Sequence, residues 1–287
     1  MRVALCQLPV SSDPAVNLDR VRGAADDAAR QGAGLAVFPE GTQVRFSADL
    51  RAAAEPLDGP FGAGLARAAR DSGVAIVAGV FEPAPGGRVY NTTVGYDPAR
   101  GLTAAYRKIH LFDALGHRES EAVAPGSQPL LADLAGLSVG FLTCYDIRFP
   151  ELARALAARG AQLLVVPAAW AAGPLKEDHW ITLVRARAIE NTIWVAAAGQ
   201  VPDPAERPTA APTGVGRSLL VDPLGVARLD LGSGPAVLAG DVDPAVTDSV
   251  RAALPSLANR RDDVFGVPAT AAPAGSTIPA VPAGVSD

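Results

Sequence analysis

Cys144 stands where a predicted buried strand meets a predicted helix, in the run TCYDIRFP at residues 143–150. A strand holds a side chain rigidly, and the positive end of the following helix favours a thiolate over a thiol. Corners of this kind are where α/β enzymes expose nucleophiles. The alternative is a buried, inert cysteine, and for one cysteine considered alone that interpretation is the more common. Cys6 lies inside a strand with no polar neighbour before Gln7, and we interpret it as inert.

Two glutamates could provide acid–base groups for a thiol nucleophile. Glu40 follows the apolar run 34–38, so it lies at the C-terminal end of a predicted strand, where α/β folds place their ligands. Glu119 belongs to a charged loop, HRESE, at residues 117–121. A solvated surface position is the alternative for both residues, and for Glu119 taken alone it is the stronger interpretation.

Lysine is scarce in this chain. Of its 25 basic residues only Lys108 and Lys176 are lysines, and the other 23 are arginines. A lysine retained against that bias can supply a compact ammonium that exchanges a proton, which a guanidinium cannot. Lys108 also follows a predicted strand, in YRKIHLFD at residues 106–113. With two lysines, an exposed surface lysine and retention by chance remain open interpretations.

The sequence lacks the motifs of metal and nucleotide sites. His110, His117 and His179 show no i, i+4 pair, and neither cysteine has a partner at CxxC spacing. There is no P-loop, no GxGxxG after a strand and no GxSxG serine motif. Neither a metal nor a cofactor is therefore expected.

The elements that must position these residues alternate between short apolar runs and amphipathic stretches. Asp13 and Pro14 form a typical helix start, and residues 97–100 form a hairpin turn. This alternation predicts an α/β protein, and the hairpin favours mixed sheets over a purely parallel one. The predicted strands are 2–8, 34–38, 74–80, 89–96, 101–107, 137–143, 162–166, 192–198, 218–222 and 235–242, and the predicted helices are 14–31, 61–72, 150–159, 176–191 and one from 244.

Composition excludes several classes of protein. The 287 residues are 49% apolar and 19% charged, which is typical of a folded globular chain of one or two domains. With 29 glycines and 25 prolines the chain has many turns, which argues against a helical bundle. A net charge of −5 makes nucleic acid a poor partner.

The ends of the chain and its cysteines indicate where the protein acts. The N-terminal residues do not resemble a secretory signal, and prolines and glycines interrupt the uncharged run 264–286, so we expect no membrane span. Two cysteines do not make a disulfide framework, which favours a reducing compartment. We expect a cytoplasmic protein with a folded domain over residues 1–262 and an irregular Pro/Ala-rich tail over residues 263–287.

Three segments resemble, in the right order, the signature motifs of the nitrilase superfamily, the carbon–nitrogen hydrolases. These segments are FPE at 38–40, YRKIHL at 106–111 and LTCYDIRFPEL at 142–152. Further similar segments are ES with PG at 119–126, VPAAW at 166–170, RARAIEN at 185–191, GRS at 216–218 and VDPLG at 221–225. The resemblance covers roughly residues 1 to 260.

The resemblance implies a nitrilase-like domain over residues 1–262, a four-layer αββα sandwich of two mixed β-sheets flanked by helices. It implies Cys144 as nucleophile, Glu40 as general base, Lys108 as the cation at the oxyanion, and Glu119 as a residue that orients the site. It also implies a small-molecule amide substrate, no cofactor, no nucleic-acid or membrane partner, and assembly as a homodimer or larger homo-oligomer.

These residue types suit the hydrolysis of an amide. A thiolate divides the reaction into formation and hydrolysis of a thioester. Glu40 can take the proton of the thiol, whose free pKa is about 8.5, and later activate water. Lys108 and the backbone N–H of Tyr145 can hold the oxyanion, and one such donor typically contributes about 3–4 kcal/mol.

The segments around the cysteine also bear on the substrate. The run CYDIRFPEL at residues 144–152 is closest to the omega-amidases and deaminated glutathione amidases, which act on α-keto amides. That branch often has Phe-Asn where Trp170-Ala171 stands, in a segment that lines the pocket, so Trp170 is expected to contact substrate. The Arg148 guanidinium could anchor a substrate carboxylate. A structural ion pair of Arg148 with Asp146 or Glu151 is the slightly favoured alternative.

Other activities remain open. Nitrile hydrolysis or transfer of the acyl group to an amine would use the same residues. A non-catalytic binding or scaffold protein is the least favoured alternative, because all four site residues are present together.

Overall fold

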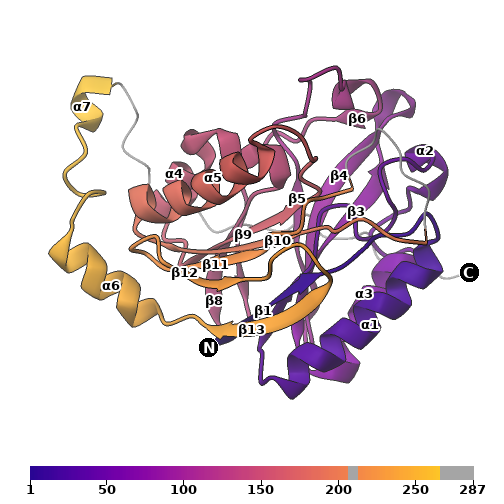
Figure 1. Ribbon diagram of the computed structural model, residues 1–287, viewed down its shortest axis with the longest axis horizontal. Helices are drawn as coiled ribbons and strands as arrows, with labels where there is room; N and C mark the ends of the chain where they lie inside the picture. The colour runs from indigo at the N-terminus through magenta and orange to yellow at the C-terminus, as the bar shows by residue number, and fades with distance from the viewer. Residues whose placement is uncertain (206–212, 266–287) are drawn as a thin grey trace, which may run out of the picture.

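The computed structural model describes residues 1–205 and 213–265, and two β-sheets form the centre of the molecule (Figure 1). In the first sheet the strand order is β13-β1-β2-β3-β4-β5, and β6 pairs with β4. The strands β1, β2 and β3 run parallel. The pairs β13–β1, β3–β4 and β4–β5 are antiparallel and β4–β6 is parallel, so the sheet is mixed. The bounds are β1 (Arg2–Gln7), β2 (Leu35–Val37), β3 (Ala75–Pro83), β4 (Val89–Asp97), β5 (Gly101–Arg107), β6 (Val123–Ala124) and β13 (Ala236–Asp241).

The second sheet has the order β12-β11-β10-β9-β8-β7. Its central strands β8, β9 and β10 are parallel, and β7, β11 and β12 are antiparallel additions at the two edges. The bounds are β7 (Leu131–Leu134), β8 (Leu137–Phe141), β9 (Leu163–Ala168), β10 (Trp194–Gly199), β11 (Leu219–Val221) and β12 (Ala227–Asp230).

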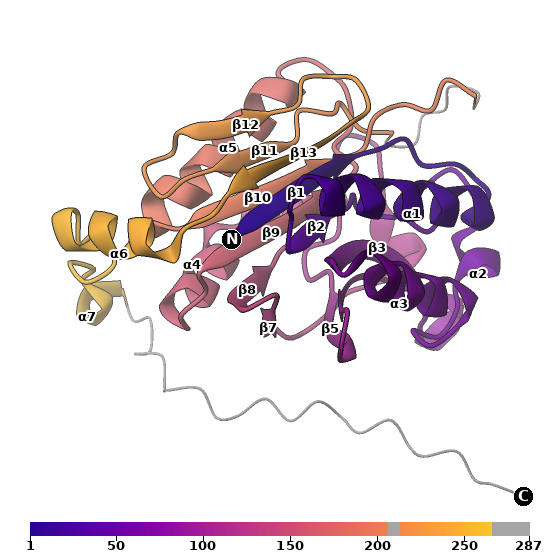
Figure 2. The same ribbon diagram turned by 90° about the horizontal axis from the view of Figure 1, so that it is seen from below.

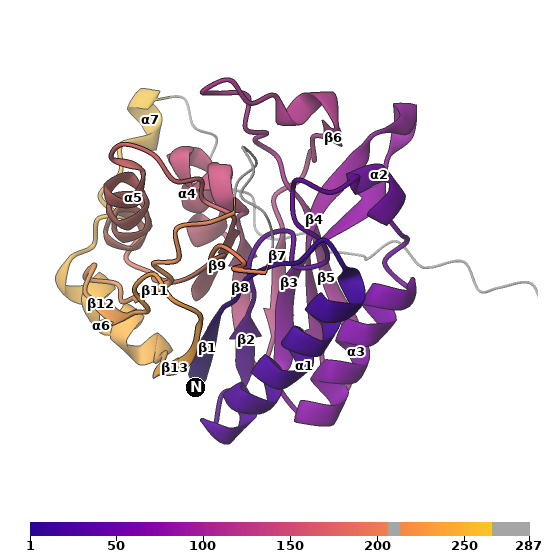
Figure 3. The ribbon, with the colours of Figure 1, turned by 45° about the vertical axis from the view of Figure 1, so that its right-hand side comes forward.

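Helices cover the outer face of each sheet. Figure 3 shows α1 (Pro14–Arg30) and α3 (Pro60–Ser72) outside the first sheet, and α4 (Pro150–Ala158) and α5 (Lys176–Asn191) outside the second. The predicted αββα sandwich of two mixed sheets is therefore confirmed. The remaining α-helices are α2 (Leu50–Ala53), α6 (Pro244–Ala253) and α7 (Asp262–Phe265).

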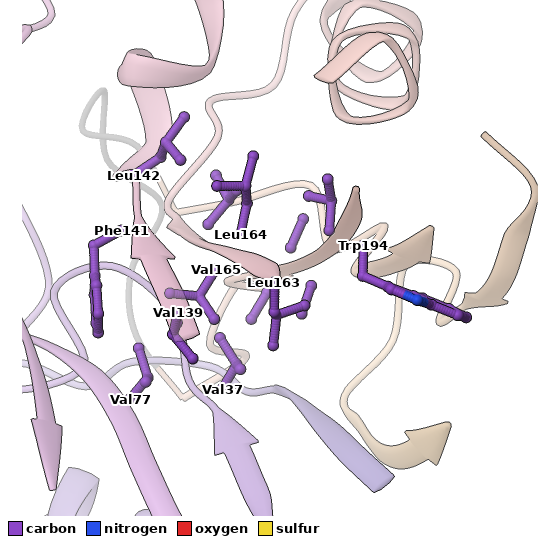
Figure 4. Close-up of a cluster of buried hydrophobic side chains, with 14 of the residues drawn as sticks. Val37, Val77, Val139, Phe141, Leu142, Leu163, Leu164, Val165 and Trp194 are labelled. Atoms are coloured by element: carbon purple, nitrogen blue, oxygen red, sulfur yellow. The ribbon is translucent and has the colours of Figure 1, made fainter. Parts of the chain in front are cut away.

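The two sheets pack face to face through aliphatic and aromatic side chains. Figure 4 shows Val37 and Val77 of the first sheet facing Val139, Phe141 and Val165 of the second, and these five side chains are fully buried. The opposite face of each sheet is also buried, because the helix layers cover it. Strands that are buried on both faces read as continuous apolar runs, which is why these segments are recognisable in the sequence.

The first and last strands of the domain, which lie near its two chain ends, pair with each other. β13 pairs antiparallel with β1 at the edge of the first sheet, although more than 200 residues separate them (Figure 2). Cys6 in β1 lies in the apolar layer beneath α1 and α3, and burial raises the pKa of its thiol far above the ordinary range. The burial and the raised pKa of Cys6 agree with the prediction that this cysteine is inert.

Local signals placed most elements within a few residues of their observed bounds. The Asp13 side chain accepts a hydrogen bond of 2.8 Å from the N–H of Ala15, so Asp13 caps α1 as predicted. The predicted strand 137–143 is too long, because β8 ends at Phe141. The 3₁₀ helix η3 (Cys144–Arg148) then precedes α4. The short elements α2, β6, β7, β12 and α7 were not predicted from the sequence.

The C-terminal region is described only in part. Of the predicted tail, residues 263–265 form the end of α7, and residues 266–287 lie outside the described residues, so the prediction of an irregular tail stays a prediction. Among the helices of the described ranges, none combines the length and the apolar character needed to cross a bilayer.

Phe141→Ala is expected to lower the free energy of unfolding by about 3–5 kcal/mol, because removal of a buried ring leaves a cavity that two packed sheets close poorly. Urea unfolding measures this change. Leu102→Ala, on a side chain 39% exposed in β5, is the control and should cost less than about 1 kcal/mol. Equal losses in the two variants would contradict the place of Phe141 in the core between the sheets.

Candidate active site

Four predicted site residues meet at one edge of the sandwich. Glu40 follows β2 and Lys108 directly follows β5 in the first sheet, whereas Cys144 follows β8 in the second sheet. Glu119 begins the 3₁₀ helix η2 (Glu119–Glu121) in the loop after β5. All four line one cavity of about 200 Å³. The sandwich brings them together because β2, β5 and β8 end at the same edge, where α/β folds bind ligands.

The Lys108 ammonium lies between the two carboxylates. Its Nζ donates to Glu40 Oε1 at 2.8 Å and to Glu119 Oε2 at 2.8 Å. Asn91 Nδ2, from β4, donates to Glu40 Oε1 at 2.8 Å and to Glu119 Oε1 at 3.1 Å. Lys108 and Glu40 are buried, and the side chain of Glu119 is only 10% exposed. The alternative of a solvated surface position is therefore wrong for all three residues.

Backbone N–H groups also hold both carboxylates. The N–H of Ala169, at the end of β9, donates to Glu40 Oε2 at 2.9 Å. The N–H of Phe112 donates to Glu119 Oε2 at 2.7 Å. Each carboxylate is therefore fixed by three partners before any substrate binds, and such prior positioning reduces the reorganisation needed during reaction.

A buried aspartate shapes the turn that carries Cys144. Asp146 accepts hydrogen bonds from the N–H of Thr143 at 2.9 Å, the hydroxyl of Tyr106 at 2.7 Å and the N–H of His110 at 3.0 Å. Cys144 adopts a φ of 47°, a backbone conformation that residues with a side chain rarely take unless their surroundings impose it. Asp146 therefore ties the strained cysteine turn of the second sheet to the loop that follows β5.

The electrostatic environment keeps the resting thiol protonated. Burial raises the pKa of the Cys144 thiol well above its ordinary value, and the Glu40 carboxylate adds to the rise, whereas the Lys108 ammonium opposes it. Burial by itself would lower the pKa of Lys108, but Glu119 and Glu40 outweigh burial and raise it well above the usual value. The raised pKa disfavours a resting thiolate, and the contribution of the helix end to that pKa stays a prediction. A base must remove the proton when substrate is present, and Glu40 is adjacent.

The predicted substrate-contacting residues divide into two groups. Tyr145 and Trp170 line the cavity. The Tyr145 N–H lies in the first turn of η3, where backbone donors lack an acceptor within the helix, so it is available to an oxyanion.

Arg148 is not brought into the cavity lining. Its guanidinium lies 4.8 Å from the centre of the Trp170 ring, with Nη2 3.5 Å from Nδ1 of His179. Within the described residues it pairs with no carboxylate, so the ion pair with Asp146 or Glu151 is also not formed. Arg148, the last residue of η3, therefore contacts the Trp170 ring and does not itself line the cavity.

Sequence reasoning missed two residues of this site. Asn91 is an amide in the middle of a buried strand, and that polar position was the available signal. Lys176 lines the cavity at the start of α5. The scarcity of lysine that directed attention to Lys108 applied equally to Lys176, and both lysines of the chain lie at this cavity. The described residues include no group of three or more His, Cys, Asp or Glu side chains able to hold a metal ion.

Comparison with known proteins agrees with this geometry. The family model described as carbon-nitrogen hydrolase matches residues 2–252. A hydrolase of Mycobacterium tuberculosis is 45% identical, over 92% of this chain and 97% of the relative. The deaminated glutathione amidase of Escherichia coli O157:H7 is 38% identical, over 91% of this chain and 97% of that enzyme.

A solved structure of an amidase from Nesterenkonia sp. AN1, a glutamate-to-glutamine variant, superimposes with a TM-score of 0.77. It is 31% identical over 93% of this chain and 98% of that chain. The fold and the family model agree, and the chain belongs to the carbon–nitrogen hydrolase family, the nitrilase superfamily. It is an amidase of that superfamily, which acts on carbon–nitrogen bonds other than peptide bonds.

Lys108→Arg is expected to lower kcat/KM almost as far as Lys108→Ala, by about a hundredfold or more. A guanidinium is wider than an ammonium and cannot occupy the same point between Glu40 and Glu119, and a displacement of about 1 Å at a reacting centre has an effect of this size. Steady-state kinetics of both variants measure the loss, and melting temperatures control for folding. An arginine variant that retains most of its activity would exclude an oxyanion role for Lys108.

Glu40→Gln is expected to move thiolate formation at Cys144 to lower pH. The Glu40 carboxylate contributes to the raised pKa of this thiol, so a neutral amide should lower that pKa, even though amide hydrolysis is lost. The ultraviolet absorbance of the thiolate during a pH titration measures the shift, with Cys144→Ala as background. An unchanged or higher titration midpoint would contradict electrostatic contact between Glu40 and the thiol.

Proposed function

We propose that the protein hydrolyses the carboxamide group of a small molecule through a thioester on Cys144. The observation that carries this proposal is the buried Lys108 ammonium, hydrogen-bonded to Glu40 and Glu119 in the same cavity as the cysteine. That arrangement supplies a base, a cation and a nucleophile within one enclosed space, which are the three requirements for opening an unactivated amide.

The first half of the reaction forms the acyl-enzyme. Glu40 takes the thiol proton as Sγ of Cys144 attacks the carbonyl carbon, and the oxyanion is held by Lys108 and the Tyr145 N–H. The carbon–nitrogen bond then breaks, and Glu40 returns the proton to the departing nitrogen, which leaves as ammonia or an amine. The raised pKa of the thiol suits this order of events, because the proton is still available to be transferred.

The second half regenerates the enzyme. Glu40 takes a proton from water, whose oxygen attacks the thioester carbonyl, and the same donors hold the second oxyanion. Collapse of the intermediate expels the sulfur, which recovers a proton from Glu40, and releases a carboxylic acid. Glu119 and Asn91 are positioning residues, since they hold the ammonium and the Glu40 carboxylate in place.

The relatives favour the same chemistry. The Nesterenkonia amidase variant carries the product of Michael addition of acrylamide at its active-site cysteine, which supports a nucleophilic cysteine at this place in the fold. The Escherichia coli relative acts, by its name, on deaminated glutathione, and we propose α-keto amides as the first substrates to test. Cytoplasmic location and assembly as a homodimer or larger homo-oligomer stay predictions.

An ammonia-release screen tests the proposal. It compares omega-amides of short keto acids, deaminated glutathione and simple aliphatic amides, each beside the matching nitrile. Hydrolysis of a nitrile but not of its amide would overturn the assignment. A product that shifts from free acid to acyl-amine on addition of an amine would make the enzyme a transferase.

Cys144→Ala is expected to abolish turnover and to leave the melting temperature within about a few degrees of the wild type, because loss of one sulfur changes the packing little. Mass spectrometry of quenched wild-type protein should detect the acyl adduct on the peptide that contains Cys144, and the alanine variant should show none. A variant with a near-normal rate would remove Cys144 as the nucleophile.

A further inference from the structure

Lys176 presents a buried ammonium to the Cys144 cavity. The residue begins α5, is 6% exposed and lines the cavity together with Phe112 and Trp170. Its Nζ lies 4.5 Å from the centre of the Trp170 ring and 5.1 Å from that of Phe112. Across residues 1–205 and 213–265, no carboxylate pairs with this ammonium.

The neighbouring acidic side chains are engaged elsewhere. Glu40 and Glu119 both bind Lys108, and Glu177, the next residue in α5, lies 3.2 Å from Arg217. Asp178 is exposed on the outer side of the helix start. The cation of Lys176 therefore lacks the counter-ion that buried charges normally have.

A second cation increases this imbalance. The Arg148 guanidinium contacts the same indole as Lys176, with centre distances of 4.8 Å and 4.5 Å. Burial lowers the pKa of Lys176, and Arg148 lowers it further, whereas a negative charge on Cys144 would raise it. The aromatic rings offset part of the cost of this charge. A bound anion in the cavity, next to the Lys176 ammonium, would offset the remaining cost of burying this charge.

The position of the ammonium is fixed by its own backbone. Trp170 Nε1 donates to the carbonyl oxygen of Lys176 at 2.7 Å, so the indole and the lysine backbone hold each other in place. The stem of Lys176 packs on Gly173, where a Cβ would approach Cγ of the lysine to 3.3 Å. The ammonium is therefore built into the cavity wall and is not a flexible group at the rim.

We propose that Lys176 binds a carboxylate of the substrate, so that the enzyme selects amides that carry an acidic group at the end remote from the scissile bond. This inference rests on the proposed function, because it places the carboxamide at Cys144. The sequence suggested Arg148 as the residue that binds a substrate carboxylate. The structure instead favours Lys176 for this role. Arg148 contacts the same indole but does not line the cavity, and Arg118 lines the cavity but is exposed.

The test compares two amides of equal chain length, succinamate with a terminal carboxylate and butanamide with a methyl group. Lys176→Met, which retains the stem and removes the charge, is expected to lower kcat/KM for succinamate by about tenfold to a hundredfold, mainly through KM. Butanamide hydrolysis should change by less than about threefold, because its binding uses no charged group. Arg22→Met removes one positive charge from α1, away from the cavity, and should affect neither substrate.

Two further measurements separate this inference from the proposed function. Calorimetry should show that succinamate binds to the Cys144→Ala protein. Binding should be lost in the double variant that also carries Lys176→Met and retained in the double variant that also carries Arg22→Met. Absence of turnover in the wild type would overturn the hydrolase mechanism, whereas retained binding without Lys176 would overturn the anchor. Lys176→Gln, measured alongside, gives the same discrimination if the methionine variant fails to fold. Equal losses for succinamate and butanamide in a folded variant would make Lys176 a structural residue and overturn the proposal.

Discussion

The buried contact of one ammonium with two carboxylates is the constraint on which the rest of the structure depends. Lys108, Glu40 and Glu119 together carry a net negative charge in a place where water is largely absent, and such a group is stable only when every oxygen is hydrogen-bonded. The partners come from β4, from the end of β9 and from the loop after β5. The edges of two different sheets must therefore align before this cluster can exist.

That constraint also explains the state of the nucleophile. Burial and the adjacent Glu40 carboxylate raise the pKa of the Cys144 thiol, so the proposed reaction needs a base that removes this proton as the thiol attacks. The positive φ of Cys144 and the buried Asp146 belong to one tight turn, which Asp146 holds by accepting a hydrogen bond from the Thr143 N–H. Strain at such a position persists because the surroundings determine it.

The cations around the cavity differ in function because they differ in partners. Lys108 is fully paired and serves as part of the fixed machinery, whereas Lys176 is buried without an acidic partner and faces the space where a substrate would lie. Arg148 contacts the Trp170 ring and adds positive potential without lining the cavity. A protein that uses arginine at almost every basic position places both of its lysines at this site, where a compact ammonium fits and a guanidinium does not.

The sequence by itself determined the layered α/β architecture. Strands such as Leu35–Val37 and Leu163–Ala168 are buried on both faces, so they form continuous apolar runs in the sequence. The start of α1 is also visible in the sequence, because Asp13 caps the helix through a local contact. It also identified Cys144, Glu40, Lys108 and Glu119, through motif order and the scarcity of lysine. It could not reveal the 3₁₀ turn at Cys144, the contribution of Asn91, the place of Arg148 or the unpaired charge of Lys176. Those features depend on which side chains from distant segments meet, and on how far burial and neighbouring charges move a proton equilibrium. Only the packing of one sheet against the other decides such contacts, because a local pattern records which residues are buried and not what they are buried against.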